Sequence, residues 1–518
     1  MLIPIILDIE NYGPKFMLLK YLCFLDKAFQ NGWPIVTHEE FDKYELNFPG
    51  RNEYKKEMMI KYNYSLHSYE ERQQIKHYFV PADFYKELEK EKGSKLEAMI
   101  SLLNEENHQF EKIMRRIFDD ILQSGEEIDG VLYYAACPLS LKIICKELNI
   151  PMIAYETGPI RRANYRCDMS YFCREGVYNT REIDKRYSKF LEEYSENTNI
   201  PIFSREEILC MFLDHHKLGF LSMIDKTPKY EIGVAGSCAL VVPFFAQNKY
   251  MDNELINDVF AAYNYKYHEV LIRFHPYDIY TATYRISKVD GSSSPFPFLI
   301  QSKRVAAVAS NVLLEAMLWK RIPCTKTQNM PANLKCYNDY LADKEVEDVE
   351  MFVNFFIFGF MVPMELAYDA DYISWRLTNP SEKEIYLFNL NYYLDKFGLN
   401  EEWVLLDREV RLNLLKMYRN YVPMTLEQFN SEFIIKNTQN TSSPSNASKA
   451  NANMNVQYQR LLANYSNLQK EYEITKEWLD NVLNSRSWKL SKPIRGFMDK
   501  LRKGKNYENG SNDSNKTQ

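Results

Sequence analysis

The tetrapeptide RFHP at positions 273–276 carries side chains suited to phosphate chemistry. It closes an apolar run that predicts a buried strand, so we expect Arg273 and His275 at the carboxyl end of that strand. An imidazole there can bind a phosphate, or donate a proton to it as it leaves, because its unperturbed pKa of about 6.5 lies near neutral pH. A structural histidine at a strand end is the alternative, and the neighbouring arginine favours the functional interpretation.

The stretch Val305–Cys324 has a pattern of strand, turn, helix and strand. An apolar run ends at Ser310-Asn311, and the residues from Val312 have helical spacing. Such a turn places backbone N–H groups and a helix N-terminus where parallel sheets bind phosphates and nucleotides. Together with His275, it predicts a nucleotide-sugar site.

Two acids of the second half could contact the donor. Glu315 lies one turn into the helix after Ser310-Asn311, where a carboxylate can accept two hydrogen bonds from a ribose diol; the alternative is a charge that favours the helix N-terminus. Asp252 follows Gln247 in a polar loop, from which both could meet the reacting carbon of the donor. As an isolated acid, Asp252 would be a helix N-cap.

A third acid, Glu156, opens the segment ETGPIRR after an apolar strand in the first half. In a parallel sheet this position lies at the substrate-binding edge, where Glu156 could activate an acceptor hydroxyl or orient a sugar. We expect Gly158 and Arg161 to contact the same sugar, and Arg161 with Arg162 would favour an anionic substrate. An ordinary turn acid and surface salt bridges are the alternatives.

No metal site is predicted. His215 and His216 are adjacent on an expected helix and point about 100° apart, so they do not readily share one ion. The sequence contains no HExxH motif, and its DxD triplet, Asp369–Asp371, is not expected to hold a metal-bound nucleotide diphosphate. We therefore expect no cofactor beyond the donor substrate, and the lack of a metal-binding triplet of this kind argues against a metal-dependent single-Rossmann transferase.

The elements that position these residues form two α/β runs, and the predicted fold class is α/β with two Rossmann-like lobes. Residues 1–228 are expected to form an N-terminal acceptor lobe with a helical insertion, and residues 229–435 a nucleotide-sugar donor lobe. The strands expected in the second lobe are Ala239–Phe244, Glu269–Phe274, Phe298–Ile300, Ala306–Ala309 and Pro323–Thr325.

Composition limits the class of protein. A chain of 518 residues is longer than a single hydrophobic core usually organises, so we expect more than one domain. The net charge of −6 argues against a protein whose main partner is nucleic acid. Nine cysteines without a CxxC pair fit a reducing cytosol better than a disulfide framework. The N-terminus lacks the basic segment of a signal peptide. No apolar run reaches the length of about 20 residues that a transmembrane helix requires.

The C-terminal part changes character. Residues 436–457 form a polar linker that we expect to be disordered, and we expect the same of residues 506–518. Between them, residues 458–505 combine heptad-like spacing with a basic amphipathic tail. Asn484–Lys505 has eight Lys or Arg beside an apolar stripe with Trp488, which predicts binding to an anionic membrane; a solvated tail is the alternative. The heptads predict a coiled coil and a homo-oligomer, or else a single packed helix.

Four motifs resemble one family. ETGPIRR at 156–162, the QNKYMDN loop at 247–253, the HP of His275-Pro276 and the SNxxxEA of 310–316 look like the bacterial Kdo transferases of capsule and lipopolysaccharide O-antigen synthesis. The resemblance implies a GT-B-like, retaining β-Kdo enzyme that uses CMP-Kdo. The tail SRSWKLSKPIR is similar to a sequence that recurs at the ends of bacterial polysaccharide glycosyltransferases.

The resemblance also implies roles for individual residues. His275 and the Ser310-Asn311 turn would hold the CMP phosphate, Glu315 the ribose, and Glu156 would lie beside the acceptor. Asp252 would be the acid at the anomeric carbon, acting as a nucleophile, since two successive displacements restore the configuration.

The function predicted on this basis is transfer of Kdo from CMP-Kdo to a surface polysaccharide or its lipid-linked precursor, on the cytoplasmic face of the cell membrane. Two alternatives stay open: a UDP- or GDP-hexose transferase of the same pathway, and a non-catalytic membrane scaffold for polysaccharide enzymes. The acceptor sugar, the linkage and the stereochemical outcome are not specified by the sequence.

Overall fold

The computed structural model describes residues 1–7, 14–38, 59, 62–134, 137–162, 164–196, 199–237, 250, 252–275 and 288–437. The chain divides into two units, residues 1–439 and 440–518, and the fold described below is that of the first. Gln247, the strand expected at Ala239–Phe244 and the whole predicted tail lie outside the described residues.

The N-terminal sheet has seven strands in the order β12-β6-β5-β4-β1-β2-β3. The five strands from β5 to β3 are parallel, whereas β6 and β12 add antiparallel to one edge. The strands are β1 (Leu2–Ile6), β2 (Ile35–His38), β3 (His77–Val80), β4 (Gly130–Tyr134), β5 (Met152–Thr157), β6 (Met169–Cys173) and β12 (Met361–Pro363).

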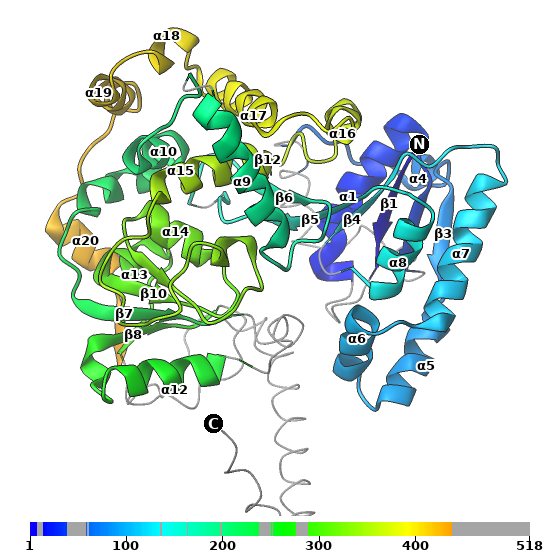
Figure 1. Cartoon of the computed structure of the whole chain (residues 1–518), viewed down its shortest axis with the longest axis horizontal. Helices are drawn as coiled ribbons and strands as arrows, with labels where there is room; N and C mark the ends of the chain where they lie inside the picture. Colours follow the sequence, from blue (N-terminus) through cyan, green and yellow to red (C-terminus); the bar gives the residue numbers. More distant parts are fainter. Residues whose placement is uncertain are drawn as a thin grey trace, which may run out of the picture. The chain divides into compact units, whose positions relative to one another are not determined.

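Helices cover both faces of this sheet because alternate side chains of its strands point in opposite directions. One face packs on α1 (Pro14–Asn31) and α16 (Ala370–Leu377). The other packs on α5 (Ala82–Lys92), α6 (Lys95–Asn104), α7 (His108–Leu122) and α8 (Leu139–Glu147). A short helix, α4 (Tyr69–Arg72), precedes β3 (Figure 1).

The second sheet has six strands in the order β11-β10-β7-β8-β9-β13, all parallel except β13. They are β7 (Tyr230–Ala235), β8 (Val270–Arg273), β9 (Lys288–Asp290), β10 (Ser302–Ala306), β11 (Ile322–Cys324) and β13 (Ile435–Asn437). Helix α12 (Asp252–Ala262) covers one face, and α13 (Phe296–Gln301) with α14 (Val312–Leu318) covers the other (Figure 1).

A helical block joins the two sheets. It contains α9 (Arg181–Glu196), α10 (Arg205–Phe212), a 3-10 segment (His215–Met223), α15 (Val349–Asn354), a π-helical segment (Phe355–Phe360) and α17 (Glu382–Phe397). The π-helical segment runs directly into β12, so the interval 229–435 contributes a strand to the N-terminal sheet as well as forming the second one. One apolar cluster extends through this block into both lobes.

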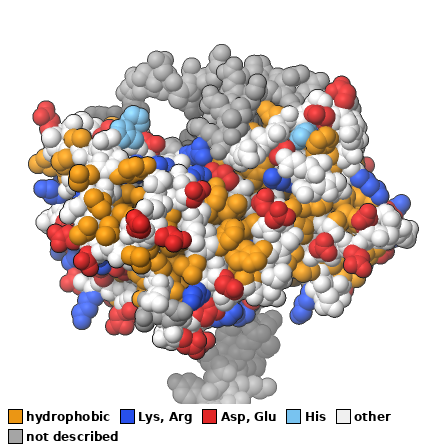
Figure 2. All heavy atoms as spheres, turned by 90° about the horizontal axis from the view of Figure 1, so that it is seen from above, with side chains coloured by type: hydrophobic (Ala, Val, Ile, Leu, Met, Phe, Trp, Pro, Cys, Tyr) orange, Lys and Arg blue, Asp and Glu red, His pale blue; other side chains and the backbone are white. Residues whose placement is uncertain are grey.

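Three further helices follow the block: α18 (Glu401–Val404), α19 (Arg408–Tyr418) and α20 (Leu426–Glu432). They carry several exposed apolar side chains, including Leu405, Met417 and Val422. In the view from above, hydrophobic side chains are interspersed with acidic and basic ones (Figure 2). Among the described helices, none is long and apolar enough to cross a membrane.

The predicted α/β class with two mainly parallel sheets, one in each lobe, is confirmed. The strand predicted at Phe298–Ile300 is wrong, because these residues form helix α13, which begins beside prolines at its first turn. The neighbouring strand therefore begins earlier than predicted: β10 ends at Ala306, where the sequence pattern had placed its start.

Candidate functional site

The carboxyl ends of three parallel strands of the second sheet meet at one edge. In the register of the sheet, Ala235 of β7 lies opposite Arg273 of β8, and Val234 lies opposite Ala306 of β10. Gly236-Ser237 after β7 and Phe274-His275 after β8 are therefore neighbours, and the N–H of Gly236 donates to the carbonyl of Arg273 at 2.8 Å. The Ser310-Asn311 turn follows β10 after three further residues.

Asp252 is brought to this edge as the first residue of α12. Its Oδ2 accepts a hydrogen bond from the backbone N–H of Ser237 at 2.7 Å. A Cβ placed on Gly236 would lie 3.4 Å from Asp252 Oδ2 and 3.5 Å from the backbone nitrogen of His275. Asp252 and the backbone of His275 thus flank the end of β7.

His275 is partly buried, and this burial lowers the pKa of its imidazole to about 4, with a smaller contribution from the positive charge of Arg161. At neutral pH the ring is therefore uncharged and offers one N–H donor and one acceptor nitrogen. A bound phosphate would favour the protonated form and raise this pKa.

The Ser310-Asn311 turn contacts both its own helix and the N-terminal sheet. Ser310 Oγ accepts the backbone N–H of Val312 at 3.3 Å. The side-chain amide of Asn311 donates to the carbonyl of Thr157 at 3.2 Å, and its Oδ1 accepts from the Tyr171 hydroxyl at 2.6 Å. Asn311 therefore joins the two lobes, and its predicted contact with a donor phosphate stays a prediction.

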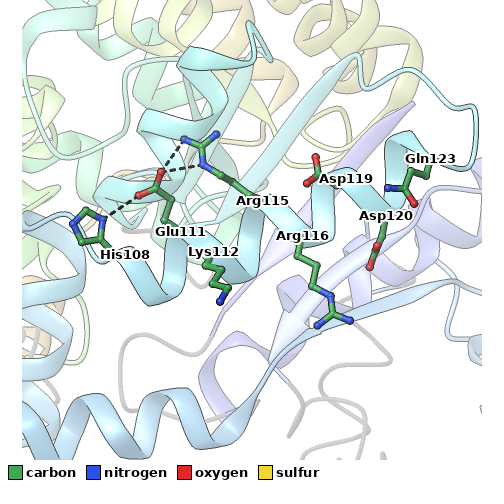
Figure 3. Close-up of a pocket in the computed structure, with 8 residues that line it drawn as sticks. All are labelled: His108, Glu111, Lys112, Arg115, Arg116, Asp119, Asp120 and Gln123. Atoms are coloured by element: carbon green, nitrogen blue, oxygen red, sulfur yellow. Dashed lines mark hydrogen bonds and ion pairs between the residues drawn. The ribbon is translucent and has the colours of Figure 1, made fainter.

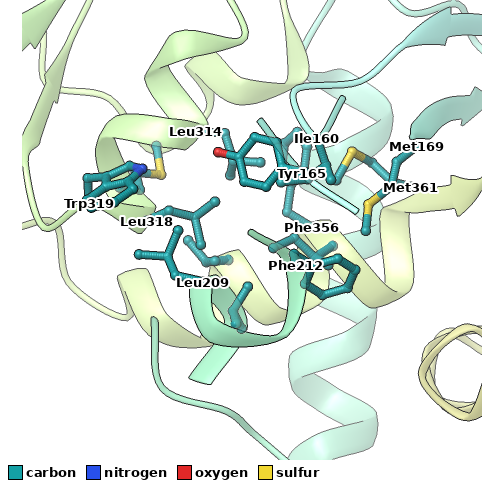
Figure 4. Close-up of a cluster of buried hydrophobic side chains, with 14 of the residues drawn as sticks. Ile160, Tyr165, Met169, Leu209, Phe212, Leu314, Leu318, Trp319, Phe356 and Met361 are labelled. Atoms are coloured by element: carbon teal, nitrogen blue, oxygen red, sulfur yellow. The ribbon is translucent and has the colours of Figure 1, made fainter. Parts of the chain in front are cut away.

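Glu315 also faces the N-terminal lobe. It is only 7% exposed, and the hydroxyl of Tyr165 donates to its Oε1 at 2.8 Å. Burial raises the pKa of Glu315 to about 7, although the Tyr165 hydrogen bond and the charges of Arg161 and Arg273 oppose this shift. The ring of Tyr165 lies in the apolar cluster beside Leu314 (Figure 4), so the loop after β5 is inserted into the core against α14.

The side chain of Arg273 makes its polar contacts at the end of its own sheet. Its guanidinium forms an ion pair with Asp290 and donates to the carbonyl of Ser292 at 3.0 Å. This contact ties the end of β8 to the end of β9. Its role in donor binding is not tested by these contacts.

Glu156, at the end of β5, is held by three donors. The hydroxyls of Tyr134 and Tyr178 donate to its carboxylate at 3.0 and 2.9 Å, and the backbone N–H of Thr157 donates at 2.7 Å. These bonds keep the carboxylate in one orientation at the edge of the sheet.

The rest of the segment ETGPIRR is tightly packed. A Cβ on Gly158 would lie 2.8 Å from Met361 Sδ and 3.1 Å from the carbonyl oxygen of Met169, so this position requires glycine because of the close approach of β6 and β12. Arg161 donates from Nε to the Gly158 carbonyl at 2.7 Å. Arg162 forms ion pairs with Asp168 and Glu365, which is the salt-bridge alternative considered for it.

The structure places predicted residues in two groups. Asp252 and the backbone of His275 lie at the end of β7, while Asn311 contacts Thr157 and Glu315 contacts Tyr165, on either side of Gly158 and Arg161 in the chain. A fourth contact between the lobes joins Ser294 Oγ to Asn164 Oδ1 at 3.2 Å.

Four residues that lie near the predicted site residues were missed from the sequence. The pair Gly236-Ser237 repeats the signal recognised at Ser310, since small polar residues follow an apolar strand, and that signal could have identified it. Tyr165 and Lys20 belong to no recognisable motif, because only the tertiary fold places them near the acids.

Two other features lie apart from this edge. Among the described residues, no group of three or more His, Cys, Asp or Glu side chains is arranged to hold a metal ion. A shallow hollow runs along α7 and is lined by that helix alone, from His108 to Gln123 (Figure 3). Its Glu111 pairs with Arg115, as is usual on a solvated helix face.

Comparison with known proteins gives a family match in the first lobe. Residues 21–182 match the model described as the glycosyltransferase 99 family N-terminal domain. A search of curated proteins finds no match to the sequence.

Solved structures with a similar chain path include two domains of KpsC from Thermosulfurimonas dismutans. Its β-Kdo 2,7 transferase matches at a TM-score of 0.31 and 12% identity, over 50% of this chain and 89% of that one. Its β-Kdo 2,4 transferase matches at a TM-score of 0.27 and 13% identity, over 44% of this chain and 78% of that one.

A third similar structure is the UDP-GlcNAc 2-epimerase of Methanocaldococcus jannaschii, with a TM-score of 0.24 and 13% identity, over 64% of this chain and 86% of that one. The family match in the first lobe, rather than these distant likenesses, identifies the chain as a glycosyltransferase.

Proposed function

We propose that this glycosyltransferase transfers Kdo from CMP-Kdo to a glycan or lipid-linked acceptor of a capsule or O-antigen, with retention of configuration. The observation that carries the proposal is the meeting of Asp252 and His275 at the end of β7. A carboxylate and an imidazole at the carboxyl edge of a parallel sheet suit a sugar bound through a phosphate.

In the proposed reaction, an oxygen of the Asp252 carboxylate attacks the anomeric carbon while the bond to the CMP phosphate breaks. The Ser237 N–H orients the carboxylate for this attack. CMP leaves with the bonding electron pair, and His275 donates a hydrogen bond to the departing phosphate. The acceptor hydroxyl then displaces the Asp252 carboxylate and gives its proton to Glu156, the base proposed on the acceptor side, and two inversions give net retention.

The leaving group supports the choice of a CMP-sugar. CMP leaves as a monophosphate, so the reaction needs no divalent ion to bridge a diphosphate. The proposed phosphate contacts are His275 and the backbone of the Ser310-Asn311 turn, and Glu315 is the proposed ribose contact. On the acceptor side, Glu156 and Arg161 would orient the incoming sugar.

Membrane attachment is a separate part of the proposal. The basic, Trp-containing segment 484–505 supports binding to anionic lipid on the cytoplasmic face, and the heptads from Tyr458 support a homo-oligomer. Deleting 484–518 should release the protein from anionic liposomes without affecting turnover on a soluble acceptor; liposome binding that survives the deletion would contradict the attachment.

The decisive experiment is mass spectrometry of the full chain incubated with CMP-Kdo and no acceptor. We expect a mass increase of one Kdo residue that localises to the peptide with Asp252 and is missing from Asp252→Asn. Thermal stabilisation by CMP but not by UDP should accompany it. Stabilisation by UDP alone would overturn the CMP-Kdo assignment in favour of a UDP-hexose donor.

A further inference from the structure

Lys20 is a buried lysine on α1 whose ammonium group makes no ion pair with a described carboxylate. Its side chain is 9% exposed. Nζ contacts Met364 Sδ at 3.7 Å and lies 5.2 Å from the centre of the Tyr134 ring. A buried ammonium without a counterion is unfavourable, because these weak contacts replace little of its lost hydration.

Burial is the main reason that the pKa of Lys20 is lowered, and the charges of Glu156 and Asp168 oppose this effect. Neither acid is left to pair with the ammonium. Glu156 accepts from Tyr134, Tyr178 and Thr157, and Asp168 accepts from the Tyr62 hydroxyl at 2.6 Å and pairs with Arg162.

Arg161 is a second cation in the same place. Its guanidinium donates to the carbonyls of Gly158 and Thr157 at 2.7 and 3.2 Å and forms no ion pair within the described part of the chain. Its charge contributes to lowering the pKa of Lys20, so the two groups lie within electrostatic reach of each other. Among the described residues these two cations have no carboxylate partner, and the acid near them, Glu156, is hydrogen-bonded to three other donors, so these three groups carry an excess of one positive charge.

We propose that Lys20 and Arg161 bind the carboxylate of an acidic sugar at the carboxyl edge of the N-terminal sheet. The inference rests on the proposed function and names the group that this lobe recognises. A monoanion matches the single excess charge of Lys20, Arg161 and Glu156, whereas a phosphate dianion would exceed it. Arg161 would supply planar N–H donors to the carboxylate, and Lys20 a point charge in a site shielded from water.

The carboxylate can come from the donor sugar or from an acidic sugar already present in the acceptor. The two sources separate in steady-state kinetics of the full chain, with CMP-Kdo and the acceptor varied independently. Lys20→Met should raise the KM of the substrate that presents the carboxylate by roughly 10- to 100-fold, the range expected for loss of a charge-assisted hydrogen bond.

Two further variants separate charge from packing. Lys20→Arg keeps the charge and should retain most of the affinity, and Lys27→Met removes a lysine from another part of α1 and should leave both KM values unchanged. The Lys20→Met protein should also melt at a higher temperature than wild type, because it no longer buries an unpaired charge. Unchanged KM values for both substrates in Lys20→Met would overturn the proposal.

Failure of the proposed function is distinguishable from failure of this site. If CMP neither binds nor appears as a product, the CMP-Kdo assignment fails, and calorimetry with free Kdo and with glucuronate then tests the site directly. Binding of either acid to the wild type that is lost in Lys20→Met supports the carboxylate site. Binding that is equal in both proteins, or undetectable in the wild type, refutes it.

Discussion

The hydrogen bond between Glu315 and Tyr165 makes a quantitative prediction about pH. Glu315 is buried in α14, and its pKa is raised from 4.5 to about 7, mainly by burial. The folded protein therefore holds a proton on this carboxyl more tightly than the unfolded chain does. Its contribution to stability is complete below about pH 4.5 and is lost as the pH rises through 7.

The size of this loss follows from the two pKa values. At about 1.4 kcal/mol for each tenfold change in an equilibrium constant, a rise from 4.5 to about 7 corresponds to about 3 kcal/mol. Most of it, roughly 2–3 kcal/mol, should develop between pH 5 and pH 8. The substitution Glu315→Gln keeps the shape and an acceptor for the Tyr165 hydroxyl but cannot ionise, so it should remove this pH dependence.

The assay is urea denaturation of the full chain at several pH values between 5 and 8, followed by tryptophan fluorescence. Wild type should lose stability relative to Glu315→Gln as the pH rises. Glu347→Gln, the same chemical change at an exposed position, should run parallel to wild type. Tyr165→Phe should steepen the loss, because its hydrogen bond lowers the pKa of Glu315. Parallel curves for wild type and Glu315→Gln would refute the reasoning.

Four other predictions concern the site. Asp252→Asn should reduce kcat by at least about 10³-fold while CMP affinity, measured by calorimetry, stays within about twofold; a smaller loss would argue against a nucleophile. Because burial lowers the pKa of His275 to about 4 and a bound phosphate would raise it, CMP affinity should increase more in wild type than in His275→Asn as the pH falls from 7 to 5, and an equal change in both proteins would contradict this reasoning. His275→Asn should weaken CMP binding roughly tenfold. Gly158→Ala should cost about 1–3 kcal/mol in thermal or urea unfolding, because its Cβ would meet Met361 Sδ at 2.8 Å.

Local patterns in the sequence were enough for many elements. Alternating apolar runs and helical spacing indicate β1, α1 and β2 between Leu2 and Val36, and β4, α8 and β5 between Gly130 and Ala154. The pattern was ambiguous at Phe298–Ile300, because a short buried helix and a buried strand are both continuous apolar runs.

The crossing of the chain back to the N-terminal sheet was not predictable in this way. Residues 351–366 are mostly apolar, which is typical of a buried segment, but nothing local shows that Met361–Pro363 would pair with β6. Strand pairing across such a sequence distance depends on the packing of the whole helical block.

The sequence by itself determined which residue types end the strands: Glu156 after one, His275 after another, and the Ser310-Asn311 turn after a third. These positions follow from local periodicity and turn chemistry, which act over a few residues. Only the tertiary structure decided what each residue contacts. In the folded protein, Asn311 and Glu315 form hydrogen bonds with the opposite lobe, and Arg273 forms an ion pair with Asp290. Lys20 lies near Glu156. Burial and charge pairing depend on segments far apart in the chain, and those effects set the pKa values of His275 and Glu315.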